Sequence, residues 1–201
     1  MSRSLRSDLM FVAEWIESGS SVLDLGCGDG SLIAYLQEEK GCRCYGVEID
    51  DANVLACMQN GVNVIQQNLE EGLALFSDKS FDMVLELQSL QVVRQTENIL
   101  GEIGRVGRSS IVTFPNFGYW RNRIALARGR MPVTKTLPYE WYDTPNLRFS
   151  TLEDFADLAQ KSGFEVVARK ALHEGRQIDF LPNLRGSLAV FRLRKLLQIA
   201  I

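Results

Sequence analysis

Apolar and polar residues follow two different periods along the first 115 residues. Short runs of mostly apolar residues predict five buried β-strands, at residues 20–26, 42–49, 62–68, 80–87 and 108–114. Apolar residues three and four positions apart predict amphipathic helices, at residues 4–17, 31–39, 50–60 and 95–106, and residues 70–76 predict a short helical turn. Strands that alternate with helices over short links are typical of a parallel sheet covered on both faces.

The pattern changes in the last third of the chain. Residues 115–150 hold four of the five prolines and are rich in Arg, Tyr and Trp. A helix is expected at 151–163, followed by strands at 164–172 and 186–197. Two consecutive strands without a helix between them predict an antiparallel hairpin at one sheet edge. We therefore expect one doubly wound α/β domain over residues 1–201, with a basic and aromatic insert at about 115–150.

Composition excludes several classes of protein. A chain of 201 residues with 46% hydrophobic residues can bury a core without disulfides. Its four cysteines form no C-x-x-C pair and it has one histidine, so no metal site is expected. The net charge of -3 predicts neither nucleic-acid nor membrane binding. We find no signal peptide or membrane span, and expect a cytoplasmic protein with reduced thiols.

Three glycines follow the first predicted strand in "VLDLGCGDGSL", residues 22–32. Glycine permits positive φ and close approach of a ligand to the backbone, so Gly26, Gly28 and Gly30 indicate a nucleotide site at the carboxyl end of the sheet. The alternative is a tight turn that binds nothing. The third glycine comes one residue too early for the dinucleotide fingerprint G-x-G-x-x-G, and Asp24 would repel a pyrophosphate. A ligand with an ammonium group fits better.

The pattern D-x-G-x-G-x-G resembles motif I of class I S-adenosylmethionine (SAM) methyltransferases. The resemblance implies a seven-stranded sheet of order 3-2-1-4-5-7-6. It also implies that Asp24 lies near the methionine ammonium, and that the backbone from Gly26 through Cys27 to Gly30 packs against the methionyl and ribose groups.

The second and third predicted strands end in further candidate cofactor residues. Glu48 ends "YGVE", where a carboxylate can accept hydrogen bonds from both ribose hydroxyls, and a solvated strand-end acid is the alternative. Ile49 would lie against the adenine, although a core role is also open. Asn68, followed by Leu69, stands where this superfamily often has Asp and could accept from the adenine amine; a turn-forming Asn is the alternative.

The chain also resembles the MetW family of methionine biosynthesis proteins over residues 5–170. The motifs that carry this resemblance are "VLDLGCGDGSL", "YGVEID", "GVNVIQQNLEEGL", "FDMVLELQSLQVV", "GRSSIVTFPNFGYWRNR" and "GRMPVTKTLPYEWYDTPNLRFSTLEDF". In that family MetW acts with MetX, a homoserine O-acyltransferase. The resemblance therefore implies an accessory subunit that binds SAM or S-adenosylhomocysteine (SAH) and activates MetX; the alternative is a methyltransferase acting on a small molecule.

No catalytic residue emerges from the sequence. The expected fourth strand leads into "ELQSLQVV", which lacks the Asn-Pro-Pro-aromatic motif of many amino-group methyltransferases. Glu86 could be a base, or equally a hydrogen-bonding acid near the cofactor. His173 is expected to be a surface or edge residue rather than a base.

Between Ile103 and Tyr139 the chain has no acidic residue but seven basic ones, among many aromatic residues. Arg, Tyr and Trp are enriched at the energetic centres of protein interfaces. Three interpretations are open: a solvated loop with its aromatic residues in the core, a docking surface for the acyltransferase at about 115–145, or an active-site lid for an anionic substrate.

Overall fold

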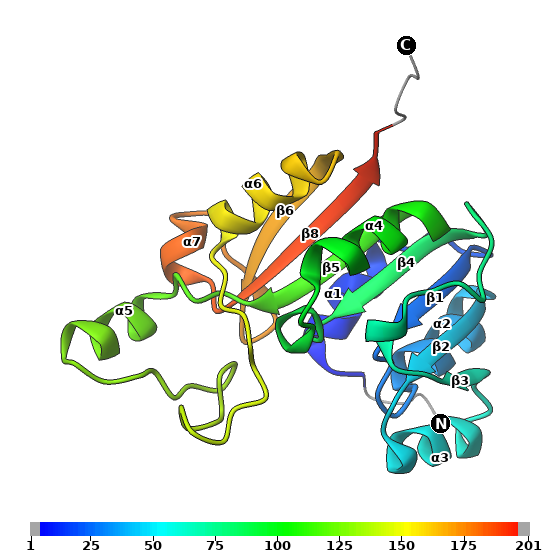
Figure 1. Cartoon of the computed structure of the whole chain (residues 1–201), viewed down its shortest axis with the longest axis horizontal. Coiled ribbons are helices and arrows are strands. Elements are labelled where there is room, and N and C mark those ends of the chain that lie inside the picture. Colours follow the sequence, from blue (N-terminus) through cyan, green and yellow to red (C-terminus); the bar gives the residue numbers. More distant parts are fainter. Residues whose placement is uncertain (1–4, 197–201) are drawn as a thin grey trace.

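The computed structural model of the chain describes residues 5–196 and is built around one eight-stranded sheet (Figure 1). The strand order is β3-β2-β1-β4-β5-β8-β6-β7. Strands β1 to β5 pair in parallel, whereas β8 lies antiparallel between β5 and β6. The strands are β1 (Ser21–Leu25), β2 (Arg43–Glu48), β3 (Val64–Gln66), β4 (Phe81–Leu87), β5 (Gly107–Pro115), β6 (Phe164–His173), β7 (Arg176–Gln177) and β8 (Leu188–Lys195).

The predicted α/β class and strand order are confirmed, because β6 and β8 take the places of the expected sixth and seventh strands. The eighth strand, β7, is a two-residue addition that pairs with the end of β6. Several expected elements are longer than the observed ones. The first helix covers only Ser7–Glu14, the third strand only Val64–Gln66 and the expected turn at 70–76 only Leu69–Glu71, and the last strand ends at Lys195. Ser4 and Leu197, which these predictions included, lie outside the described residues.

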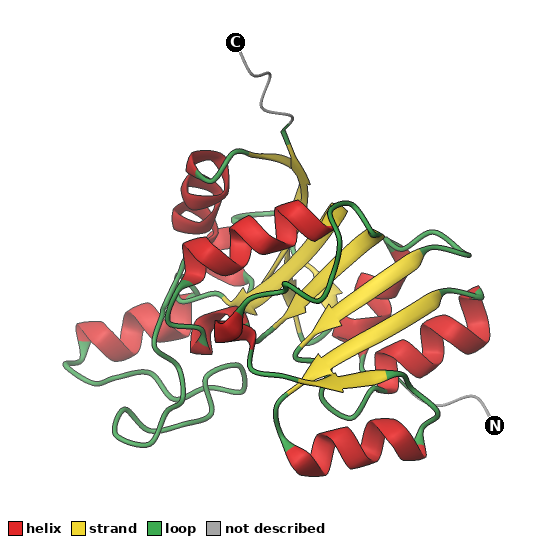
Figure 2. Ribbon diagram, turned by 45° about the vertical axis from the view of Figure 1, so that its right-hand side comes forward, coloured by secondary structure: helices red, strands yellow, loops and turns green. Residues whose placement is uncertain are grey.

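Helices cover both faces of the sheet, as the alternating pattern predicts (Figure 2). The cluster of buried side chains on one face includes residues of α1, α2 and α3, and the cluster on the other face includes residues of α4 and α6. Among the described residues, no helix has the length and apolar character to cross a bilayer. The helices are α1 (Ser7–Glu14), α2 (Ser31–Lys40), α3 (Asp51–Gln59), α4 (Thr96–Val106), α5 (Trp120–Ala127), α6 (Leu152–Lys161) and α7 (Pro182–Arg185), with the short 3-10 helices η1 (Leu69–Glu71) and η2 (Leu90–Val92).

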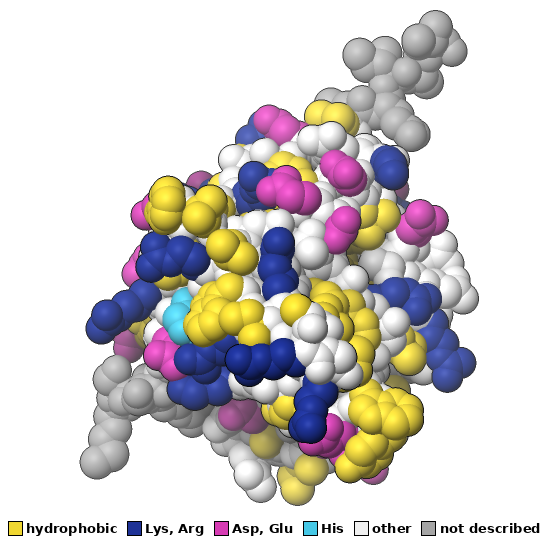
Figure 3. Space-filling model, turned by 90° about the vertical axis from the view of Figure 1, so that its left-hand side faces the viewer, with side chains coloured by type: hydrophobic (Ala, Val, Ile, Leu, Met, Phe, Trp, Pro, Cys, Tyr) yellow, Lys and Arg dark blue, Asp and Glu magenta, His cyan; other side chains and the backbone are white. Residues whose placement is uncertain are grey.

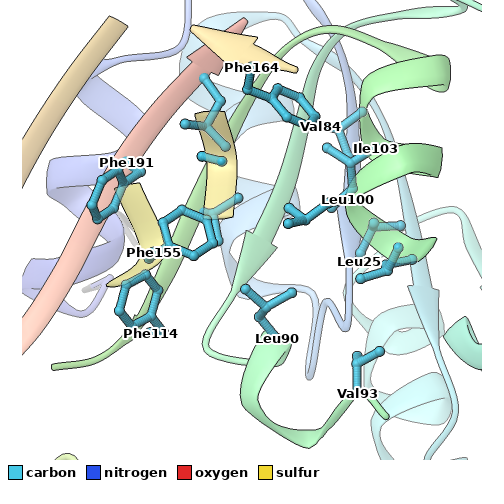
Figure 4. Close-up of a cluster of buried hydrophobic side chains, with 14 of the residues drawn as sticks. Leu25, Val84, Leu90, Val93, Leu100, Ile103, Phe114, Phe155, Phe164 and Phe191 are labelled. Atoms are coloured by element: carbon cyan, nitrogen blue, oxygen red, sulfur yellow. The ribbon is translucent and has the colours of Figure 1, made fainter. Parts of the chain in front are cut away.

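Three buried aromatic rings join α6 to the antiparallel half of the sheet (Figure 4). The ring of Phe155 on α6 lies 4.8 Å from both Phe114 on β5 and Phe191 on β8, measured between centroids. Aromatic pairs at this distance add to the free energy of apolar burial. The cluster therefore holds the end of β5 in place, where the insert leaves the sheet.

The insert begins after β5 and returns to the sheet at Ser150, which bridges Asn116. Figure 1 shows α5 and the loop after it projecting away from the sheet. The side chain of Asn116 is fully buried and donates to the carbonyls of Asn183 (2.9 Å) and Gly186 (2.8 Å). Its own oxygen accepts from the Gly118 amide. A single asparagine therefore fixes the base of the insert against α7.

Candidate functional site

The glycine loop joins β1 to α2 at the carboxyl edge of the parallel strands. Gly26, Gly28 and Gly30 have φ values of 72°, 56° and 73°, in the left-handed region that favours glycine. A Cβ atom on Gly26 would touch Ser89, whereas a Cβ atom on Gly28 would point into open space. The loop thus presents bare backbone at Gly28, where a ligand can approach closely.

Glu48 is nearly buried at the end of β2, and its carboxylate is anchored by backbone amides. Oε2 accepts from Gly28 (2.8 Å), and Oε1 accepts from Ile49 (2.7 Å) and Asp50 (3.0 Å). A carboxylate has about four acceptor positions, so about one remains, on Oε2. The structure therefore joins the end of β2 directly to the glycine loop and brings two separately predicted features together.

Asp24 lies one residue before the end of β1 and is buried. Its Oδ1 atom has no hydrogen-bond partner among the described residues. Burial, with a smaller contribution from the negative charge of Glu48, raises the pKa of Asp24 to about 7. A buried carboxylate without a partner is costly, so a cationic group beside it would be strongly favoured. This environment fits the ammonium group expected here.

The remaining cofactor candidates lie at the ends of β2 and β3. Ile49 is 58% exposed, so it has no core role and is free to cover a flat ring. Asn68 caps η1, where its Oδ1 accepts from the Glu70 amide at 3.0 Å, and one lone pair is left for a ligand. Leu69 packs half-buried against the core. The last candidate, Cys27, lies in the glycine loop, and its Sγ atom is 3.7 Å from the Sγ atom of Cys57 on α3.

Ser89 is a site residue that the sequence analysis missed. Its Cβ and Oγ lie against Gly26, and its Oγ lies 2.7 Å from Glu86 Oε1 and 3.2 Å from the Leu25 carbonyl. Glu86 is fully buried at the end of β4, and its Oε2 has no partner among the described residues. Burial is the main cause that raises the pKa of Glu86 to about 8. A serine between a strand and a short helix is common in loops, so the sequence does not predict its contact with Gly26 and Glu86.

His173 is the last residue of β6 and is half-buried, and it pairs in register with Arg176 of the edge strand β7. Its Nδ1 lies 3.1 Å from Ser187 Oγ, and its ring packs 5.2 Å from the ring of Tyr119. These contacts belong to the base of the insert. The structure does not bring His173 together with Asp24, Glu48 or Glu86 in any hydrogen bond among the described residues.

The aromatic residues of the insert divide into a buried and an exposed group. Tyr119 is buried, but Trp141 and Tyr142 are 70% and 72% exposed. Further exposed apolar side chains extend along α5 and the following loop, and include Trp120, Ile124, Leu126, Met131, Val133 and Tyr139. Figure 3 shows this side of the molecule, where hydrophobic side chains lie among lysines and arginines.

The basic residues divide in a similar way. Arg105 and Arg108 pair with carboxylates of the sheet scaffold, and Lys135 pairs with Glu174. Five arginines of the insert form no ion pair within residues 5–196; they are Arg121, Arg123, Arg128, Arg130 and Arg148. A surface with large exposed apolar side chains and unpaired arginines resembles an uncovered interface more than a solvated loop.

Solved structures share this fold. A SAM-dependent methyltransferase from Archaeoglobus fulgidus superposes with a TM-score of 0.71 at 16% identity, covering 94% of this chain and 92% of that one. Another, from Thermotoga maritima, has a TM-score of 0.67 at 20% identity, with 94% and 88% covered. At these identities the likeness establishes the class I SAM methyltransferase fold.

Sequence comparisons give the family. A family model described as methionine biosynthesis protein MetW matches residues 6–193. The bifunctional methionine biosynthesis protein MetXA/MetW of Rhodopirellula baltica is 39% identical over 208 residues, which cover 96% of this chain and 33% of that protein. The chain spans about a quarter to a third of the length of the curated relatives it matches. The match to the family model extends over nearly the whole chain, and the chain therefore belongs to the MetW family of methionine biosynthesis proteins.

Proposed function

We propose that the chain is an accessory subunit that binds SAM or SAH and acts with a homoserine O-acyltransferase of the MetX type in methionine biosynthesis. Its family supports the pathway, and the relative from Rhodopirellula baltica, whose name joins MetXA and MetW in one protein, supports the partner. The observation that supports the ligand is the buried oxygen of Asp24 that has no partner among the described residues, four residues before the open backbone of Gly28.

In this proposal each residue of the cofactor pocket has one role. Asp24 faces the ammonium of the ligand, the remaining acceptor position of Glu48 takes a ribose hydroxyl, and Ile49 covers the adenine. Asn68 accepts from the adenine amine through its remaining lone pair. Bound SAM supplies a methyl group on a sulfonium, and bound SAH supplies the same pocket contacts without it.

Two glycines offer a matched test of the pocket. Gly28 and Gly41 both have positive φ, and a Cβ atom on either would meet no atom within 4 Å. Alanine at either position should therefore lower the free energy of unfolding by a similar amount, about 1 kcal/mol. We expect Gly28→Ala to weaken SAH binding at least tenfold in calorimetry, because the methyl group enters the pocket, whereas Gly41→Ala binds normally. Equal SAH affinities for the two variants would mean that the ligand does not bind at Gly28.

The docking surface is the part of the insert from 115 to 145. Its exposed Trp141 and Tyr142 are large, rigid apolar groups of the kind that dominate binding energies. Its unpaired arginines favour an acidic face on the acyltransferase. The base of the insert is fixed by buried asparagines, so the start of the surface is anchored to the sheet before the partner binds.

The docking test compares large apolar residues of similar exposure. Trp141→Ala and Tyr142→Ala are expected to weaken binding of the purified acyltransferase at least tenfold in a pull-down or calorimetric titration. Leu75→Ala removes a leucine that is 69% exposed outside the insert and is expected to leave binding unchanged. Unaltered binding by all three variants would locate the interface elsewhere.

The methyltransferase alternative is favoured by one observation, the buried Glu86 whose Oε2 atom has no partner. Its contact through Ser89 to Gly26 places it next to the glycine loop. Protonated at neutral pH, it would act as a proton donor rather than a base until a ligand changed its environment. Release of SAH from SAM with an added acceptor, lost in Glu86→Gln, would support this alternative over the accessory role.

A further inference from the structure

A cavity of about 560 Å³ lies on the α4–α6 face of the sheet. It is bounded by η2, the start of α4, the end of β5, α6 and the last residues of the insert. It shares no lining residue with the glycine loop or with the cofactor candidates. The proposed function leaves this cavity without a role.

The interior of the cavity is apolar. Six hydrophobic side chains line it, and they are Leu90, Phe114, Leu137, Phe149, Phe155 and Leu158. Figure 4 shows Leu90, Phe114 and Phe155 reaching the same region from different elements. Cavities of 300–1,000 Å³ with mostly apolar walls and a few fixed polar groups are typical of small-molecule sites.

Two of its polar residues carry buried oxygens that lack a partner among the described residues, Gln91 Oε1 and Thr96 Oγ1. The Gln91 amide is fixed, because its Nε2 donates to the Gln88 carbonyl at 2.6 Å. Gln91 Oε1 can therefore only accept. Buried polar atoms normally have partners, so Gln91 Oε1 indicates a ligand with an N–H or O–H donor, whereas the Thr96 hydroxyl can donate to a ligand or accept from it.

Charged residues of both signs stand at the rim. Asp154 is engaged by Thr151, and the guanidinium of Arg148 donates to the carbonyls of Leu147 and Arg94. Within residues 5–196, none of the four charged residues that line the cavity, Arg94, Arg148, Glu97 and Asp154, forms an ion pair. Positive and negative groups without ion-pair partners therefore line the same cavity, which matches a head group that carries both charges.

We propose that this cavity binds an α-amino acid with an apolar side chain. The side chain lies among the phenylalanines and leucines. The ammonium group donates to Gln91 Oε1 and faces Glu97, and the carboxylate faces Arg94 and accepts from the Thr96 hydroxyl. The cavity is a second ligand site, separate from the cofactor pocket.

The 3-10 helix η2 separates the two sites. Ser89, directly before η2, touches Gly26 on the cofactor side, and Leu90 lines the cavity on the other side. The Gln91 carbonyl also accepts from the amides of Leu147 and Arg148, so η2 holds the end of the insert. A ligand in the cavity therefore contacts the same short element that borders the cofactor pocket.

The test uses L-phenylalanine as the probe, titrated into the full chain and followed by NMR shifts of leucine methyl groups. Phenethylamine, which lacks the carboxylate, and hydrocinnamate, which lacks the ammonium, are the matched probes. We expect L-phenylalanine to bind at least tenfold more tightly than either, because each lacks one charge-assisted contact of about 1.5–3 kcal/mol.

Variants assign the binding to the cavity. Leu158→Trp fills it and is expected to reduce phenylalanine affinity at least tenfold, whereas Leu75→Trp, which adds the same ring at an exposed position outside the cavity, leaves it unchanged. Thr96→Val keeps the shape and removes one hydrogen bond, a loss of about fivefold. It serves as the test if Leu158→Trp fails to fold.

SAH titrations of the same variants distinguish a failure of this proposal from a failure of the proposed function. Normal SAH binding with lost phenylalanine binding supports a separate site. Equal phenylalanine affinity in wild type, Leu158→Trp and Thr96→Val would overturn the proposal, as would equal affinity for all three probes.

Discussion

At the scale of single residues, two carboxyl groups at the carboxyl edge of the sheet are held where ionisation is unfavourable. Asp24 pairs in register with Leu85, and Leu25 pairs with Glu86. Since neighbouring residues of a strand point to opposite faces, Asp24 and Glu86 lie on opposite faces of the sheet. Burial raises the pKa of Asp24 to about 7 and that of Glu86 to about 8.

These two groups make folding stability depend on pH. Their pKa values in the folded protein exceed the ordinary values of 3.8 and 4.5. At pH values between the ordinary and the raised pKa, the folded state therefore binds more protons than the unfolded state. The contribution of these two groups to the free energy of unfolding therefore falls as pH rises from about 4 to about 8. Each group contributes a slope of up to about 1.4 kcal/mol per pH unit.

Glu86→Gln removes one of these groups, so we expect a flatter stability profile than wild type between pH 5 and 8. The variant gains stability relative to wild type as pH rises. Urea unfolding at a series of pH values measures this difference. Glu38→Gln, on the exposed surface of α2, is the matched control and should follow wild type. Parallel profiles for wild type and Glu86→Gln would mean that Glu86 ionises as freely as in the unfolded chain.

At the scale of elements, the insert depends on a buried asparagine network at its base. Besides the bonds of Asn116, the fully buried Asn122 on α5 donates to the carbonyls of Asn116 and Phe117. These side-chain bonds add to the backbone bridge between Asn116 and Ser150 at the same place. The insert is therefore an ordered extension of β5 rather than a free loop.

Asn116→Ala leaves the carbonyls of Asn183 and Gly186 without their donor, and the Gly118 amide without its acceptor. We expect a loss of about 1–3 kcal/mol in the free energy of unfolding. We also expect faster proteolysis within residues 117–150, seen as new fragments by mass spectrometry. Asn98→Ala, at an exposed position on α4, is the control. Wild-type proteolysis of Asn116→Ala would show that other contacts hold the insert.

At the scale of the whole molecule, charge is unevenly distributed. The net charge is -3, yet the insert holds five arginines without carboxylate partners among residues 5–196. A basic surface on an acidic protein orients it toward an acidic partner and raises the association rate at low salt.

We therefore expect the association rate with the acyltransferase to fall as salt rises, and stopped-flow mixing measures it. Replacing Arg128 and Arg130 with glutamine should reduce both the rate and its salt dependence. The same change at Arg192 and Arg194 on β8 is the control, because it removes equal charge outside the insert. Identical salt dependence in wild type and the insert variant would contradict an electrostatic role for this surface.

The sequence by itself determined the α/β class, the strand order through family resemblance, and the glycine loop, because periodicity and glycine spacing are local properties of the chain. It also predicted that Asp24 and Glu48 would share one edge, since parallel strands end together. Only the tertiary structure decided the contacts of Ser89, the cavity beside η2 and the exposure of Trp141 and Tyr142. These features depend on how side chains from distant segments pack. The local sequence pattern does not show which of several aromatic residues in one segment will be buried.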